Sequence, residues 1–182
     1  DNPDYDYDPE KAKALLAEAG VEGLELDFLL SAGDTVHDQI GVIVKDQLQK
    51  VGISVNLVKQ ETGQQWETTV AGEYDISVNY WTNDIIDPDQ KATFSVYGDE
   101  ENRSYYTSYR NPKVAELVEQ GRIELDRAKR QAIYYEIQKI AKEDVHWIDL
   151  YYSPFRNASR SNVKGFFQNP MGRFMLEDVT IE

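Results

Sequence analysis

The chain has 182 residues, with 33 acidic and 19 basic side chains and a formal net charge of −14. Such a negative surface repels phosphate backbones, so we expect no nucleic-acid partner. The sequence contains no cysteine, which excludes disulfides, cysteine-bound metals and thiol nucleophiles. No stretch reaches the roughly 20 apolar residues of a membrane-spanning helix.

Helix and strand signals alternate through the first half of the chain. Asp8 and Pro9 suit the N-cap and first position of a helix, and Gly20 suits its end. Asp34 or Thr35 is expected to cap the next helix. In chain order, the sequence predicts a helix over 8–20, a strand over 24–30, a helix over 34–52, a strand over 53–57, a helix from a Thr62 cap to Gly72 and a strand over 74–80. This order predicts βαβ crossovers, and therefore an α/β fold with a largely parallel sheet flanked by helices.

The second half of the chain begins with a long, polar segment over 82–110, which we expect to be mostly loop. The further predicted elements are a short helix over 90–97, helices capped by Asn111 and Asp126, and a late strand in which Ile148, Leu150 and Tyr152 alternate. Residues 153–182 show little periodicity, so no element is predicted there.

The segment 81–89 follows directly on the third predicted strand. Ligands of open α/β sheets bind beyond the carboxyl ends of the strands, so this loop is the candidate site. Trp81 offers a flat apolar surface, and Asp84 offers a carboxylate that can hold an ammonium ion, such as a peptide's α-amino group. The predicted ligand-binding residues are Trp81, Thr82, Asn83 and Asp84. The alternative is an ordinary loop in which the Asp residues cap turns and Trp81 packs in the core.

Metal-binding and catalytic interpretations have less support. Asp84, Asp87 and Asp89 suggest calcium, but their spacing does not match that of an EF-hand loop. A hydrolase with paired carboxylates needs acids in contrasting environments, which nothing in the sequence indicates. His37 and His146 are expected to be ordinary surface or boundary residues, because no catalytic motif surrounds them. We therefore expect no enzyme activity, no metal and no cofactor.

Several segments, taken together and in order, resemble one protein family. They are Tyr7-Asp8-Pro9-Glu10 through Gly20, Gln47 through Val55, Gly72 through Ile76 with Trp81 through Asp89, Tyr109 through Val114 with Arg130 and Glu143-Asp144, and Gly172-Arg173 through Val179. The family is that of the family 5 extracellular solute-binding proteins, of the dipeptide-, oligopeptide- and nickel-binding type. The last segment is most similar to the dipeptide-binding branch. Residues 145–149 depart from the family, which usually has prolines there.

The resemblance implies the C-terminal lobe of a type II-like periplasmic binding-protein fold. Residues 1–152 are then the ligand-binding lobe, and residues 153–182 return to an N-terminal lobe that is missing from this chain. The implied function is the substrate-binding component of an ABC transporter that imports di- or oligopeptides, with a membrane permease as partner. The implied location is extracytoplasmic, in the periplasm or as a lipoprotein on the outer face of the membrane.

The family motif matched by Trp81 and Asp84 is the one whose Asp receives the peptide α-ammonium. Another solute, such as a nickel chelate or an oligosaccharide, remains an alternative cargo on the same fold.

Overall fold

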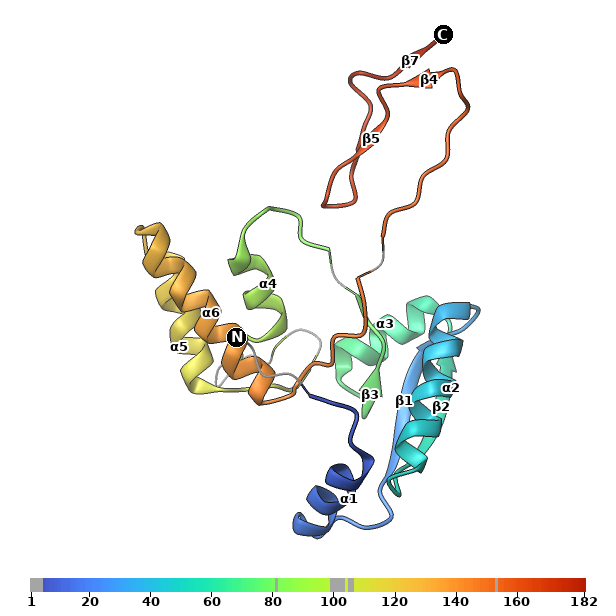
Figure 1. The fold of residues 1–182 in the computed structure, drawn as a ribbon, viewed down its shortest axis with the longest axis vertical. Helices are drawn as coiled ribbons and strands as arrows, with labels where there is room; N and C mark the ends of the chain where they lie inside the picture. The colour runs from blue at the N-terminus through green and yellow to red at the C-terminus, as the bar shows by residue number, and fades with distance from the viewer. Residues whose placement is uncertain (1–4, 81, 99–103, 105–106, 153) are drawn as a thin grey trace. The chain divides into compact units, whose positions relative to one another are not determined.

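A computed structural model describes residues 5–80, 82–98, 104, 107–152 and 154–182 (Figure 1). The chain forms two compact units. The first consists mainly of residues up to 80, and the second contains the described residues after 80, apart from 107 and 108. Within the described ranges, no helix combines the length and the apolar character needed to cross a membrane.

The first unit is built on a three-stranded parallel sheet. Its elements are α1 (Pro9–Glu18), β1 (Glu25–Ser31), α2 (Thr35–Gln49), β2 (Ser54–Gln60), α3 (Thr62–Ala71) and β3 (Ile76–Ser77). The strand order is β2-β1-β3, and β1 pairs in parallel with both neighbours. The predicted α/β fold with a parallel sheet is thus confirmed. The third strand is shorter than the expected span of 74–80.

Alternation along β1 explains why helices cover both faces of this sheet. Phe28 and Leu30 are 2% and 0% exposed and belong to the cluster that packs against the apolar side of α2. Leu29 points the opposite way, since neighbouring side chains of a strand alternate. Ser31 shares the face of Leu29 and donates a hydrogen bond to Gln65 of α3. We infer that α3 covers the face opposite to α2.

The helix starts test the capping predictions. Asp8 accepts a hydrogen bond from a backbone N–H of the first turn of α1, and Asp34 accepts two at the start of α2, so Asp34 and not Thr35 is the cap. The prediction of a Thr62 cap is wrong, because α3 already begins at that residue. Since β2 runs to Gln60, only Glu61 is left to make the turn, and it forms no side-chain capping bond.

The second unit contains three helices, α4 (Pro88–Ser95), α5 (Pro112–Ile123) and α6 (Arg127–Glu143). Asn111 and Asp126 cap α5 and α6 as predicted, and α4 begins two residues before the expected helix. In a helix, apolar residues three, four and seven positions apart lie on one face, and the apolar faces of these three helices pack together. The buried cluster consists of Ala92, Val96, Val114, Leu117, Val118, Tyr134, Ile137 and Ala141.

The C-terminal part differs from the sequence-based expectation. The strand predicted around Ile148 and Leu150 is wrong: these side chains are 71% and 53% exposed, and the described residues from 145 to 152 include no strand. Alternation alone does not make a strand, because each strand needs a partner for its backbone groups. Four short strands that the sequence did not predict do pair, β4 (Val163–Lys164) with β7 (Thr180–Ile181) and β5 (Phe167–Gln168) with β6 (Phe174–Met175).

Both histidines lie at the boundary between core and solvent, as expected. The Nδ1 atom of His37 accepts a hydrogen bond of 3.1 Å from the backbone N–H of Ser31, which ties α2 to the end of β1. His146 lies 3.1 Å from the carbonyl oxygen of Ala141 through its Nδ1, and its ring packs on Tyr109 with 4.3 Å between ring centroids. Each imidazole therefore has a structural role.

We expect His146 to make the second unit sensitive to acid. Burial lowers the pKa of His146, because the charged imidazolium loses its hydration. The stabilisation that the neutral, buried His146 provides is complete above the unfolded-state pKa of about 6.5. It is lost as the pH falls below that value, because the unfolded chain then binds a proton more readily than the folded chain does. His146→Phe keeps an aromatic ring against Tyr109. Its free energy of unfolding should fall less between pH 7.5 and 5.5 than that of the wild type, and equal slopes would contradict the prediction.

Candidate functional site

The candidate loop, residues 82–87, is the last part of the connection between β3 and α4 in sequence. Asp84 is its most exposed acidic side chain, with 70% of its surface accessible. Thr82 is exposed and Asn83 is half-buried. Trp81, which the sequence also predicted to bind ligand, lies outside the described residues. The loop therefore presents at least one carboxylate to solvent beside two small polar side chains.

Gln90 of α4 holds the backbone and the side chain of Asp84. Its Oε1 atom accepts hydrogen bonds from the backbone N–H groups of Asp84 and Ile85, at 2.7 and 3.1 Å. Its Nε2 atom donates to Oδ2 of Asp84 at 3.0 Å. Arg173 donates to the backbone carbonyl of Asp84 at 3.2 Å, and the same nitrogen lies 3.8 Å from Oδ1. An ionised carboxylate can accept about four hydrogen bonds, so Asp84 has capacity left for a ligand.

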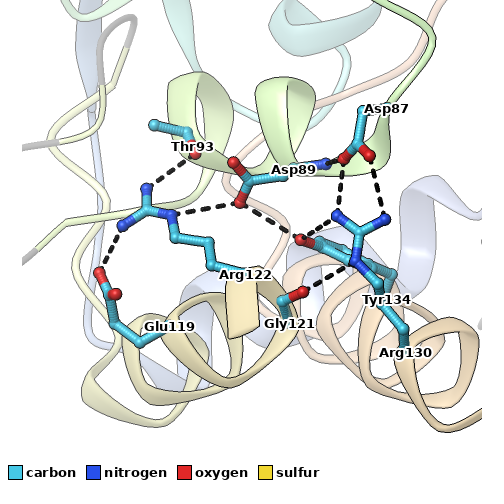
Figure 2. A network of polar contacts seen from close by, with 8 residues as sticks. All are labelled: Asp87, Asp89, Thr93, Glu119, Gly121, Arg122, Arg130 and Tyr134. Atoms are coloured by element: carbon cyan, nitrogen blue, oxygen red, sulfur yellow. Dashed lines mark hydrogen bonds and ion pairs between the residues drawn. The ribbon is translucent and has the colours of Figure 1, made fainter. Parts of the chain in front are cut away.

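The two other acids of the segment are engaged within the protein (Figure 2). Both oxygens of Asp87 accept hydrogen bonds from Arg130, at 2.8 and 3.0 Å. Asp87 also caps α4 through the backbone N–H of Asp89. The paired guanidinium holds the pKa of Asp87 below its usual value, so this carboxylate stays ionised. Asp87 thus fits the alternative in which an Asp of this loop caps a turn, and the exposed Asp84 does not.

Asp89 joins α4 to the other two helices. It accepts hydrogen bonds from Arg122 of α5 and from the hydroxyl of Tyr134 on α6, both at 3.2 Å (Figure 2). Arg122 also donates to Thr93 at 2.9 Å. Together with the Asp87–Arg130 pair, these bonds fix the first turn of α4, which carries Gln90.

This network engages two of the three acids that suggested calcium. Asp87 and Asp89 direct their oxygens to Arg130 and Arg122, and a guanidinium in that position repels a cation. In the part of the chain that the structure describes, no three potential metal-ligating side chains converge.

An open hollow of about 570 Å³ lies beside the loop. Its lining combines apolar surface from Ile85 and Phe94 with the charged groups of the network. The lining residues are Ile85, Asp87, Asp89, Gln90, Thr93, Phe94, Arg122 and Arg130. Because the charged groups bind one another, Ile85 and Phe94 provide the apolar contact in this hollow.

Sequence reasoning did not assign Gln90 a role, although a local signal was present. Asp87 is the N-cap of α4 and Gln90 is its third residue, which is the spacing of a capping box. In that motif the Gln side chain reaches back to the N-cap N–H. Here it reaches further, to Asp84 and Ile85. Arg122 had no such signal, because its partners Asp89 and Thr93 lie about thirty residues away in sequence.

Comparison with known proteins agrees with the resemblance seen in the sequence. The family model for bacterial extracellular solute-binding proteins, family 5, middle, matches residues 1–104. The chain is 32% identical over 176 residues to di/tripeptide-binding protein 2 of Pseudomonas aeruginosa, covering 92% of this chain and 32% of that protein. It is 30% identical over 188 residues to the dipeptide-binding protein of Escherichia coli, covering 100% of this chain and 35% of that protein.

The fold is also found among solved structures. The oligopeptide-binding protein AppA of Bacillus subtilis, in complex with a nonapeptide, superimposes with a TM-score of 0.80 at 22% identity, covering 100% of this chain and 39% of that chain. The chain spans about a third of the length of the curated relatives that it matches. These relatives are named as binding proteins and not as enzymes. The chain belongs to the family 5 bacterial extracellular solute-binding proteins.

Proposed function

We propose that this chain is a lobe of the substrate-binding component of an ABC transporter, and that its cargo is a di- or oligopeptide. The observation that carries the proposal is the exposed carboxylate of Asp84, held by α4 in a loop that follows a parallel strand. Family membership supports the binding role, and the names of the relatives favour peptides as cargo.

Asp84 is the proposed partner of the peptide α-ammonium. Charge-assisted hydrogen bonds between an ammonium and a carboxylate are short and about twice as strong as neutral ones. Thr82 and Asn83, next to Asp84 in the loop, are proposed to supply further polar contacts. Trp81 is proposed to supply an apolar wall for the first side chain of the peptide.

We propose that a second lobe completes the site. One lobe alone leaves much of a ligand in water, which weakens an ion pair. Residues 1–152 are proposed as the ligand-binding lobe, and residues 153–182 as the segment that contacts an N-terminal lobe. The closed protein is proposed to dock on a membrane permease outside the cytoplasm. Since the chain covers about a third of its relatives, binding is best measured on the longest natural protein that contains it.

Titration of that protein with a dipeptide and with its N-acetylated form tests the proposal. At pH 6.5 a free α-amino group is charged, since its pKa is near 8. We expect the free dipeptide to bind at least about tenfold more tightly than the acetylated one, because acetylation removes the charge that Asp84 recognises. Equal affinities, or no binding of either, would reject peptide recognition through Asp84.

Mass spectrometry of the small molecules that co-purify with the protein identifies the cargo independently. Peptides with free N-termini are expected. A nickel chelate or an oligosaccharide in their place would keep the transport function and replace the cargo. Cleavage of the added peptide during the titration would instead favour a hydrolase.

A further inference from the structure

Gln90 connects the exposed carboxylate to the rigid part of the second unit. Its side-chain amide makes three hydrogen bonds, two to backbone N–H groups of the loop and one to Oδ2 of Asp84. Gln90 lies in the first turn of α4, directly after Asp87 and Asp89, which Arg130 and Arg122 anchor. The amide therefore transmits the position of α4 to the carboxylate.

The orientation of the Asp84 carboxylate affects ligand binding because this side chain is exposed. An exposed Asp side chain samples several rotamers, and immobilising it on binding costs free energy. The hydrogen bond from Gln90 to Oδ2 restricts that motion before the ligand arrives, and Oδ1 accepts no hydrogen bond from Gln90. The Arg173 guanidinium lies 3.8 Å from Oδ1, which shows that a cationic group can approach this oxygen.

We propose that Gln90 is a positioning residue that orients Asp84 for the cationic end of the ligand. The inference rests on the proposed function, because it assumes that Asp84 receives an ammonium group. Both the oxygen and the nitrogen of the amide are required for this positioning. The oxygen holds the loop backbone, and the nitrogen directs the carboxylate.

Gln90→Met tests the proposal, since methionine has a similar length and removes all three hydrogen bonds. The measurement is the ratio of the dissociation constants of an N-acetylated and a free dipeptide, in the natural protein that contains this chain. We expect the free dipeptide to bind about three- to tenfold more weakly and the acetylated one to bind unchanged, so that the ratio falls by the same factor. A purely structural defect would weaken both ligands equally and would overturn the proposal.

Gln90→Glu separates the two halves of the amide. A carboxylate at this position can still accept the two backbone hydrogen bonds, but it cannot donate to Oδ2 and it repels the carboxylate of Asp84. The free dipeptide should then bind more weakly than it does to the wild type, while the acetylated one should bind unchanged. Full retention of the affinity for the free dipeptide would contradict the role of the amide nitrogen.

Gln131→Met is the matched control, because it makes the same substitution on α6, where the amide donates to Tyr135 on an exposed surface. It should leave both dissociation constants unchanged. Failure of the inference and failure of the proposed function give different results. If only the inference fails, the wild type still prefers the free dipeptide and Gln90→Met prefers it equally. If the proposed function fails, the wild type itself shows no preference.

Discussion

Replacing Asp84 by asparagine is expected to weaken the binding of a free dipeptide more than tenfold. The substitution keeps the shape of the side chain and its ability to accept a hydrogen bond from Gln90, but it removes the negative charge. A hydrogen bond that involves a charged group contributes about 1.5–3 kcal/mol, which corresponds to a factor of more than ten in affinity. Calorimetry at pH 6.5, on the natural protein that contains this chain, measures the loss.

Asp46→Asn is the control for the change in net charge. Asp46 lies on α2, is 64% exposed and pairs with Lys50, outside the candidate loop. It should leave the affinity within about twofold of the wild type, because an exposed charge paired on its own helix surface contributes little. An N-acetylated dipeptide should bind equally to the wild type and to Asp84→Asn. An unchanged affinity of Asp84→Asn for the free dipeptide would remove this residue from the site.

Much of the first unit could be predicted from the sequence because its signals are local. The Asp8 cap, the Asp34 cap and the alternation in β1 all act over a few residues, and the strand–helix–strand order then favours parallel pairing. The error over 148–152 and the missed strand Phe167–Gln168 have a common cause. Whether a short alternating segment becomes a strand depends on a partner elsewhere in the chain, which the pattern itself does not reveal.

The segment and the ligand-binding role of Asp84 were predicted from the sequence, but the roles of Asp87 and Asp89 were not. Asp87 and Asp89 differ from Asp84 because their partners lie on α5 and α6. Arg130 pairs with Asp87 across 43 positions, and this long-range pairing makes Asp87 structural. The assignment of Asp84 as a ligand-binding residue stays a prediction, as do those of its three neighbours.

Breaking the Asp87–Arg130 pair is expected to destabilise the second unit by about 2 kcal/mol. Arg130 is 27% exposed and forms a two-bond contact with Asp87, and its Nε donates to the carbonyl of Gly121 at 2.8 Å (Figure 2). Arg130→Gln removes the charge and the forked geometry, and it leaves the half-buried Asp87 without its cation. Urea unfolding followed by circular dichroism measures the loss, and faster hydrogen exchange in α4 assigns it to this unit.

Two further variants distinguish the stabilising effect of the Asp87–Arg130 pair from that of an ordinary exposed ion pair. Arg130→Lys keeps the charge but not the planar fork that reaches Asp87 and Gly121 together, so it should restore only part of the stability. Lys13→Gln breaks an exposed pair with Glu10 on α1 and should change the unfolding free energy little. A double-mutant cycle with Asp87→Asn gives the coupling energy. Additive effects of the two substitutions would mean that the ion pair does not anchor α4, and Gln90 would then lack the rigid support from which it is proposed to orient Asp84.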